Sequence, residues 1–179
     1  MISRIRLALL ALLLAGLAAG LITPLAGATS AHSRTFSPLL SSRELWATVD
    51  VCNPAHQRDT VGIRGAMPGD GQANDRMYMS FRLQYLNPVT GHWTNLLSSA
   101  SASYVPVGGA ASARQGGRSF QLVPPAAGKP AVTLRGVADF QWRRGKTIVE
   151  QAERTSTAGH KSLAGADPAG YSAASCVIS

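Results

Sequence analysis

The sequence predicts an all-β domain, a single antiparallel β-sandwich of about seven to nine strands. From residue 45 to the C-terminus, short stretches alternate between apolar and polar residues, as strands do when they bury one face. Glycine and proline interrupt the chain every ten residues or so, which is the spacing of turns between short strands. Beyond the N-terminal leader, apolar residues do not recur at helical spacing. Many short strands divided by turns are typical of a sandwich or barrel.

The clearest strand is expected over residues 77–86. Apolar residues occupy every odd position from Met77 to Tyr85, and mostly polar residues occupy the even positions. Residues 45–52 alternate in the same way, and the segment 87–91, Asn-Pro-Val-Thr-Gly, has the composition of a hairpin turn. The other strands are expected at 60–64, 92–97, 119–123, 132–143, 147–154 and 171–178.

Two connections stand out between these strands. Residues 98–117 are rich in serine, alanine and glycine, so we expect a long loop with at most a brief strand near Tyr104. Arg144, Gly145 and Lys146 predict a tight turn between two long strands.

The first 28 residues read as a helical signal peptide. Arg4 and Arg6 form a positive start, a leucine- and alanine-rich run follows, and small residues precede a first cleavage site after Ala28 and a second after Ala31. The alternative is a retained membrane anchor over residues 7–26, because about 20 apolar residues span a bilayer. Residues 29–44 are then a flexible lead-in, and residues 45–179 form the sandwich domain.

Cys52 and Cys176 are the only cysteines. In an exported protein, two cysteines in an oxidising compartment most simply pair with each other. The sequence therefore predicts one disulfide that encloses nearly the whole domain, and a secreted or extracytoplasmic location.

The charge of the chain argues against nucleic acid as a partner. Without Arg4 and Arg6 the formal charge falls from +8 to about +6, and the remaining basic residues are scattered rather than gathered into a stripe interleaved with aromatic residues. The partner is expected to be an unidentified extracellular or cell-wall component. Contact with a membrane is expected only if residues 7–26 are retained as an anchor.

No motif for catalysis, cofactor binding or metal binding is complete. The histidines lie in polar, turn-like surroundings without a second ligand at strand or helical spacing: His32, His56, His92 and His160. Asp70 and Asp75 lack the spacing of a calcium loop and read as a polar turn. Glu150 and Glu153 fall on opposite faces of one strand. We therefore predict no catalytic residue, no cofactor and no metal site.

A serine triad can be written from Ser172, His160 and Asp167, but the sequence does not support it. A serine nucleophile usually occupies a sharp turn flanked by glycines, and here only Gly170 precedes the serine while Ala174 replaces the closing glycine.

The tryptophans are candidates for ligand binding rather than for catalysis. Trp142 shares a face with apolar neighbours and is expected in the core, whereas Trp46 and Trp93 could stack against a ligand such as a wall polysaccharide.

Two stretches of the sequence are similar to a group of small secreted actinobacterial proteins without an assigned activity. They are Thr60–Pro68 with Arg76–Phe81, and Val137–Ile148, which has the strand, tryptophan, turn and strand of those domains. The resemblance implies an immunoglobulin-like or fibronectin-like sandwich.

The run Asp167–Tyr171 also resembles the segment that leads into a late strand of immunoglobulin-like domains, where the tyrosine hydroxyl bonds back to the backbone. In that pattern the second cysteine would stand at position 173, which is Ala173 here. The departure predicts that Cys52 and Cys176 tie a first strand to a last one, rather than forming the inter-sheet bridge of antibody domains.

Together these features predict an exported, non-enzymatic binding or structural module of the cell envelope or extracellular space. It is expected to recognise its partner through a surface such as the 98–117 loop or an exposed sheet edge. The alternative is a secreted enzyme or protease inhibitor whose site is assembled from scattered residues.

Overall fold

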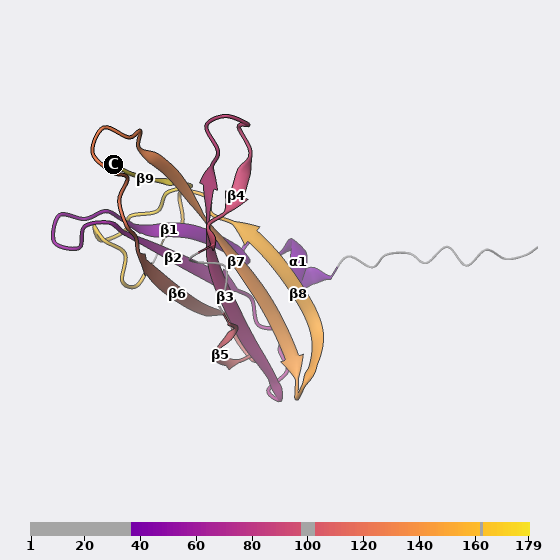
Figure 1. The fold of residues 1–179 in the computed structure, drawn as a ribbon. Helices are drawn as coiled ribbons and strands as arrows, with labels where there is room; N and C mark the ends of the chain where they lie inside the picture. The colour runs from indigo at the N-terminus through magenta and orange to yellow at the C-terminus, as the bar shows by residue number, and fades with distance from the viewer. Residues whose placement is uncertain (1–36, 98–102, 162) are drawn as a thin grey trace, which may run out of the picture. The chain divides into compact units, whose positions relative to one another are not determined.

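The computed structural model describes residues 37–97, 103–161 and 163–179, which form a two-layered all-β fold and confirm the predicted sandwich class (Figure 1). These described residues contain nine strands, within the predicted range, and one short helix. The elements are α1 (Pro38–Ser41), β1 (Trp46–Cys52), β2 (Thr60–Met67), β3 (Asp75–Leu86), β4 (Trp93–Asn95), β5 (Val105–Gly109), β6 (Arg114–Gln121), β7 (Val132–Arg144), β8 (Thr147–Thr155) and β9 (Cys176–Ile178).

The strands form two antiparallel sheets of unequal size. The smaller sheet has the order β1-β2-β6, with β2 in the centre. The larger sheet has β3 and β7 in its centre; β4 and β5 pair with β3, while β8 and β9 pair with β7. Figure 1 shows β3, β7 and β8 running side by side as the longest strands of this sheet. The predicted tight turn at Gly145 and Lys146 joins β7 to β8.

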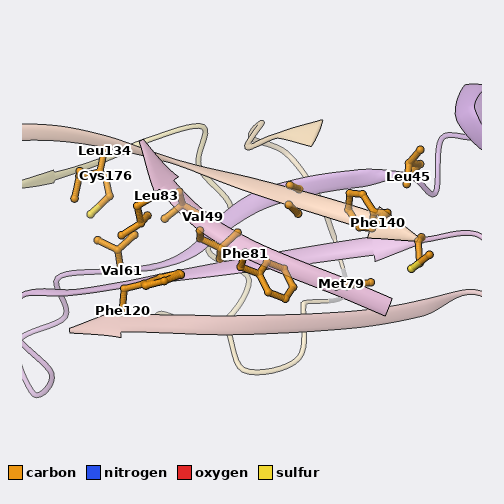
Figure 2. Packing of buried hydrophobic residues seen from close by; sticks show 14 of the residues in the cluster. Leu45, Val49, Val61, Met79, Phe81, Leu83, Phe120, Leu134, Phe140 and Cys176 are labelled. Atoms are coloured by element: carbon orange, nitrogen blue, oxygen red, sulfur yellow. The ribbon is translucent and has the colours of Figure 1, made fainter. Parts of the chain in front are cut away.

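The core lies between the two sheets and follows the predicted alternation. On β3 the odd-numbered residues from Met77 to Leu83 are buried, and on β7 Phe140 and Trp142 are fully buried. Figure 2 shows Phe81 among side chains from both sheets. The indole N–H of Trp142 donates a 2.9 Å hydrogen bond to a backbone carbonyl, which satisfies its one polar atom inside the core. The expectation of a core position for Trp142 is confirmed.

Strand β1 is buried on both faces, although its sequence predicts a strand buried on one. Thr48 and Asp50 point away from the core, yet they are 0% and 3% exposed. The segment between β8 and β9 covers them, since the backbone of Val49 exchanges hydrogen bonds with Ala173, and Asp167 donates to the carbonyl of Asp50. The apolar and polar alternation of β1 does not predict this burial, because it depends on a segment that is distant in sequence and packs over the strand.

The disulfide between Cys52 and Cys176 is confirmed, with the two Cα atoms 5.5 Å apart. It ties the first strand to the last, as predicted, although Cys176 stands at the start of β9 and not at its end. Because β1 belongs to the smaller sheet and β9 to the larger one, the bond does join the two sheets, and the expected contrast with an inter-sheet bridge does not hold. Tyr171 lies in a turn before β9 rather than in a strand, and its backbone N–H donates to the carbonyl of Pro168.

The prediction for residues 98–117 is confirmed in part: a brief strand does lie next to Tyr104, but most of the described residues of the expected long loop, 103–117, belong to strands. Strand β5 occupies Val105–Gly109, and β6 begins at Arg114 rather than at Ser119. A Cβ on Gly116 would lie 2.9 Å from a Val107 methyl carbon and 3.1 Å from the Met79 sulfur, so glycine lets β6 pack closely against the larger sheet. Glycine in this segment suggests a loop, but at Gly116 it is needed because the strand packs too closely for a side chain. Residues 98–102 lie outside the described residues.

Two other predicted strands are shorter in the structure. The strand expected at 171–178 is limited to Cys176–Ile178, and the returning strand of the hairpin is limited to Trp93–Asn95. The first is short because residues 163–175 run as turns and single bridges along β1 instead of pairing continuously.

The end of the predicted flexible lead-in is ordered against the domain. Residues Pro38–Ser41 form α1, Leu39 and Leu40 pack against the core, and Arg154 donates a 2.6 Å hydrogen bond to the carbonyl of Leu40. Helical spacing does not predict this element, because four residues are too few to show a period. The predicted signal peptide at 1–28, with its cleavage sites and possible anchor, lies outside the described residues. In the described part of the chain, no helix has the length and hydropathy needed to cross a membrane.

Candidate functional site

The outward side of the larger sheet carries polar and aromatic side chains, interrupted on β7 by the buried Val137, and we call this surface the outer face. It arises because β3 and β7 are antiparallel neighbours in close register, so that their outward residues stand in two adjacent rows. Its residues are Tyr78, Arg82, Gln84, Trp93, Tyr104, Arg135, Asp139, Gln141, Arg143 and Glu153; Gln141 is itself buried, Glu153 is exposed, and the others are half-buried. From Arg135 to Arg143 the row on β7 extends over about 26 Å at the usual rise of a strand.

One end of the outer face is an arginine between two tyrosines. The guanidinium carbon of Arg143 lies 4.2 Å from the ring centroid of Tyr78 and 5.2 Å from that of Tyr104. Gln141 fixes this arginine, because its side-chain oxygen accepts a 2.8 Å hydrogen bond from Nε and a second bond from the same guanidinium. Burial raises the pKa of the Tyr104 phenol and the Asp139 carboxylate raises it further, while the Arg143 and Arg82 cations oppose the rise. The result is a fixed group of two aromatic rings, one cation and one amide.

The centre of the outer face is a charged triad. Arg82 donates hydrogen bonds to Asp139 on β7 and, at 2.5 Å, to Glu153 on β8. Burial raises the pKa of the Asp139 carboxyl, Arg82 opposes that rise, and the neighbouring Glu153 carboxyl adds to it. Asp139 and Glu153 stand directly opposite each other in the β7 and β8 register. Arg82 therefore bridges two adjacent carboxyl groups and holds them in place.

The other end of the outer face contains Trp93, one of the two predicted stacking residues. The guanidinium of Arg135 lies 4.5 Å from a ring centroid of Trp93 and also donates a 2.8 Å hydrogen bond to Gln84. Gln84 in turn donates to Asn95 on β4. Trp93 is half-buried, with one ring face covered by an arginine. It therefore extends the outer face along β3 and is not an isolated surface ring.

Trp46, the second predicted stacking residue, lies elsewhere. Its ring stacks on His160, with centroids 4.2 Å apart and planes inclined by 14°. Burial lowers the pKa of this histidine, so the neutral imidazole is favoured in the stack. Trp46 borders two hollows of about 330 and 530 Å³ that share Arg43. The stack fastens the segment that follows β8 onto the smaller sheet, which gives Trp46 a structural role.

The residues of the conceivable serine triad are not arranged for catalysis. The hydroxyl of Ser172 lies 2.8 Å from that of Thr48 and accepts a 3.0 Å hydrogen bond from the backbone N–H of His160, not from its ring. The His160 ring instead contacts Thr157 at 2.8 Å. Asp167 pairs with His56, 2.9 Å from its Nε2.

The acidic residues considered for metal binding have other partners. Asp70 accepts a hydrogen bond from the backbone of Gln72, as in a polar turn. Asp75 is fully covered and accepts bonds of 2.8 and 2.9 Å from Arg144, which lowers the pKa of its carboxyl. Among the residues that the structure describes, no group of three or more histidine, cysteine, aspartate or glutamate side chains could hold a metal ion.

Sequence reasoning missed most of the outer face. Tyr78, Tyr104 and Arg143 come from three segments, and the pairing that brings them together depends on the register of β3 with both β5 and β7. The sequence pattern that could have predicted the outer face is the outward row of β3, where aromatic, basic and amide residues alternate with the core residues.

Comparison of this chain with protein-family models, with curated proteins and with solved structures finds no match. The candidate site therefore rests on the chain's own geometry.

Proposed function

We propose that this protein is an exported, non-enzymatic binding module whose outer face recognises an extended, neutral or mixed-charge polysaccharide of the cell envelope. The observation that carries the proposal is the group formed by Tyr78, Tyr104 and Arg143 beside the amide of Gln141. The disulfide supports an extracytoplasmic location, because such bonds persist in oxidising compartments. Export through the leader at residues 1–28 belongs to the same proposal.

The chemistry of the outer face suits a sugar polymer. A sugar ring has an apolar side that packs on aromatic rings, and hydroxyl groups that bond to amide, guanidinium and carboxylate groups. The outer face offers these groups in rows on neighbouring strands, fixed by their own contacts before a ligand arrives. Fixed side chains lose little entropy on binding, which favours recognition by a preorganised surface. Three arginines and two carboxylates are interspersed on the outer face, so a highly charged polymer of either sign is a poorer fit.

The test is binding of the purified protein to peptidoglycan and to arabinogalactan, with two variants of the outer face. Arg143→Ala and Tyr104→Ala should each weaken binding about fivefold or more, because truncated anchor residues at an interface cost upward of about 1 kcal/mol. Arg118→Ala is the matched control, since Arg118 is an exposed arginine on the smaller sheet that also lies over an aromatic ring. If Arg118→Ala weakens polysaccharide binding as much as Arg143→Ala does, the assignment of the site to the outer face is contradicted.

A further inference from the structure

An apolar hollow, chemically different from the outer face, lies at the open end of the sandwich. It has a volume of about 530 Å³, which is within the range of small-molecule sites. Figure 1 shows the loop between β6 and β7 beside β9 and the C-terminus, where this groove is located. The described lining residues are almost all apolar: Leu96, Gln121, Leu122, Val123, Pro125, Ala126, Lys129, Pro130, Val132, Leu134 and Ile178.

The floor of the groove is the core itself. Leu134 and Ile178 are 2% and 1% exposed, and they belong to the paired strands β7 and β9. The rim is exposed, and Val123 keeps 94% of its accessible surface. A ligand that fills the groove therefore contacts rigid core side chains below and covers exposed apolar surface above, and covering apolar surface drives binding.

The outer wall is held in shape by its turn. The backbone N–H of Lys129 donates a 2.9 Å hydrogen bond to the carbonyl of Ala126, and Gly128 has φ of +79°, which glycine adopts without strain. Pro125 and Pro130 on either side restrict the backbone further. The turn places Lys129 at the groove, where it is the only charged residue among the described lining residues.

We propose that this groove binds a free single-chain anionic amphiphile, such as a fatty acid, with its hydrocarbon chain in the groove and its head group at Lys129. Charge complementarity identifies the head group as an anion. The apolar lining identifies the body as hydrocarbon, because a peptide backbone would leave its N–H and C=O groups without partners there. This groove is separate from the outer face, so the amphiphile proposal does not depend on the polysaccharide proposal.

The experiment is calorimetric titration of the purified protein with octanoate, decanoate and dodecanoate, each kept below its micelle concentration. Each added buried methylene should tighten binding about fourfold, until the chain exceeds the groove. Dodecyltrimethylammonium has a similar chain and the opposite charge, and it should bind more weakly than dodecanoate. Equal affinity for the cation, or no binding of any of the three acids, would overturn the proposal. Binding to phosphatidylglycerol vesicles without binding of free dodecanoate would overturn it as well.

Variants locate the ligand in the groove. Lys129→Gln should weaken dodecanoate binding about two- to fivefold, the range for an exposed charge pair, while Lys146→Gln in the turn between β7 and β8 should leave it unchanged. Ala126→Trp should abolish binding by filling the groove. Val123→Asp should weaken binding because its carboxylate repels the acid. Val123 is highly exposed, so this variant should fold, and it tests the site even if Ala126→Trp does not fold. Unchanged affinity in both Ala126→Trp and Val123→Asp would show that the acid binds elsewhere.

Discussion

Breaking the disulfide should remove a large part of the stability of the domain. Cys52 and Cys176 are 124 positions apart. In the chain-entropy model, closing a loop of this length lowers the entropy of the unfolded chain enough to stabilise the fold by roughly 5 kcal/mol. Whole domains are commonly stable by only about 5–15 kcal/mol, so the reduced protein should be marginally stable. Cys52 and Cys176 are the only cysteines, so no second disulfide compensates for the loss of this one.

The assay is urea unfolding followed by tryptophan fluorescence, with and without a reductant. The oxidised protein should unfold at a clearly higher urea concentration, and its free energy of unfolding should exceed that of the reduced protein by roughly 5 kcal/mol. The double variant Cys52→Ala/Cys176→Ala is the control, because reductant should not change its unfolding curve. If reduction lowers the free energy of unfolding by less than about 1 kcal/mol, the loop-closure reasoning is refuted for this domain.

Three further substitutions test the core and the buried charge. Trp142→Phe should lower the free energy of unfolding by about 1–3 kcal/mol, because a buried carbonyl loses its donor. Gly136→Ala should cost about 1–3 kcal/mol, since the added Cβ would lie 2.9 Å from the Cγ atoms of Ile63. Arg64→Ala should cost about 3–5 kcal/mol at pH 7, because it strands the buried carboxylate of Asp50. Burial already raises the pKa of Asp50, so protonation at lower pH should shrink this last deficit. Urea unfolding measures the free energy of unfolding of the three variants, and Arg64→Ala is measured at both pH 7 and pH 5. If the loss of stability in Arg64→Ala is larger at pH 5 than at pH 7, the predicted direction of the pH dependence is wrong.

The larger sheet could be predicted well because its local pattern and its burial agree. The odd positions of β3 and the position of Trp142 on β7 follow from period-two alternation alone, since one face of each strand is buried. The early start of β6 could not be predicted, because Gly116 is selected by a close approach to Met79 on another sheet. Local propensity and tertiary packing point in opposite directions at that position, and packing decides.

The candidate site could be predicted only in part. Trp93 was identified as a possible contact residue from its type and place in the chain. Its role in the outer face depends on Arg135, which lies far away in sequence and reaches it through the register of β3 with β7. Trp46 looked equivalent in sequence, but its stacking on His160 depends on how the segment after β8 returns over the smaller sheet. Such long-range pairing is not encoded in the neighbourhood of either tryptophan.

The most direct test of the central claim is to map the ligand contact by NMR, using arabinogalactan oligosaccharides titrated into isotope-labelled protein. We predict chemical-shift changes concentrated on the outward residues of β3 and β7, with Tyr78, Gln141 and Arg143 among the largest, and with Tyr104 beside them. Changes confined to Trp46 and His160 would contradict the account, as would spectra that stay unchanged with both the oligosaccharides and soluble peptidoglycan fragments.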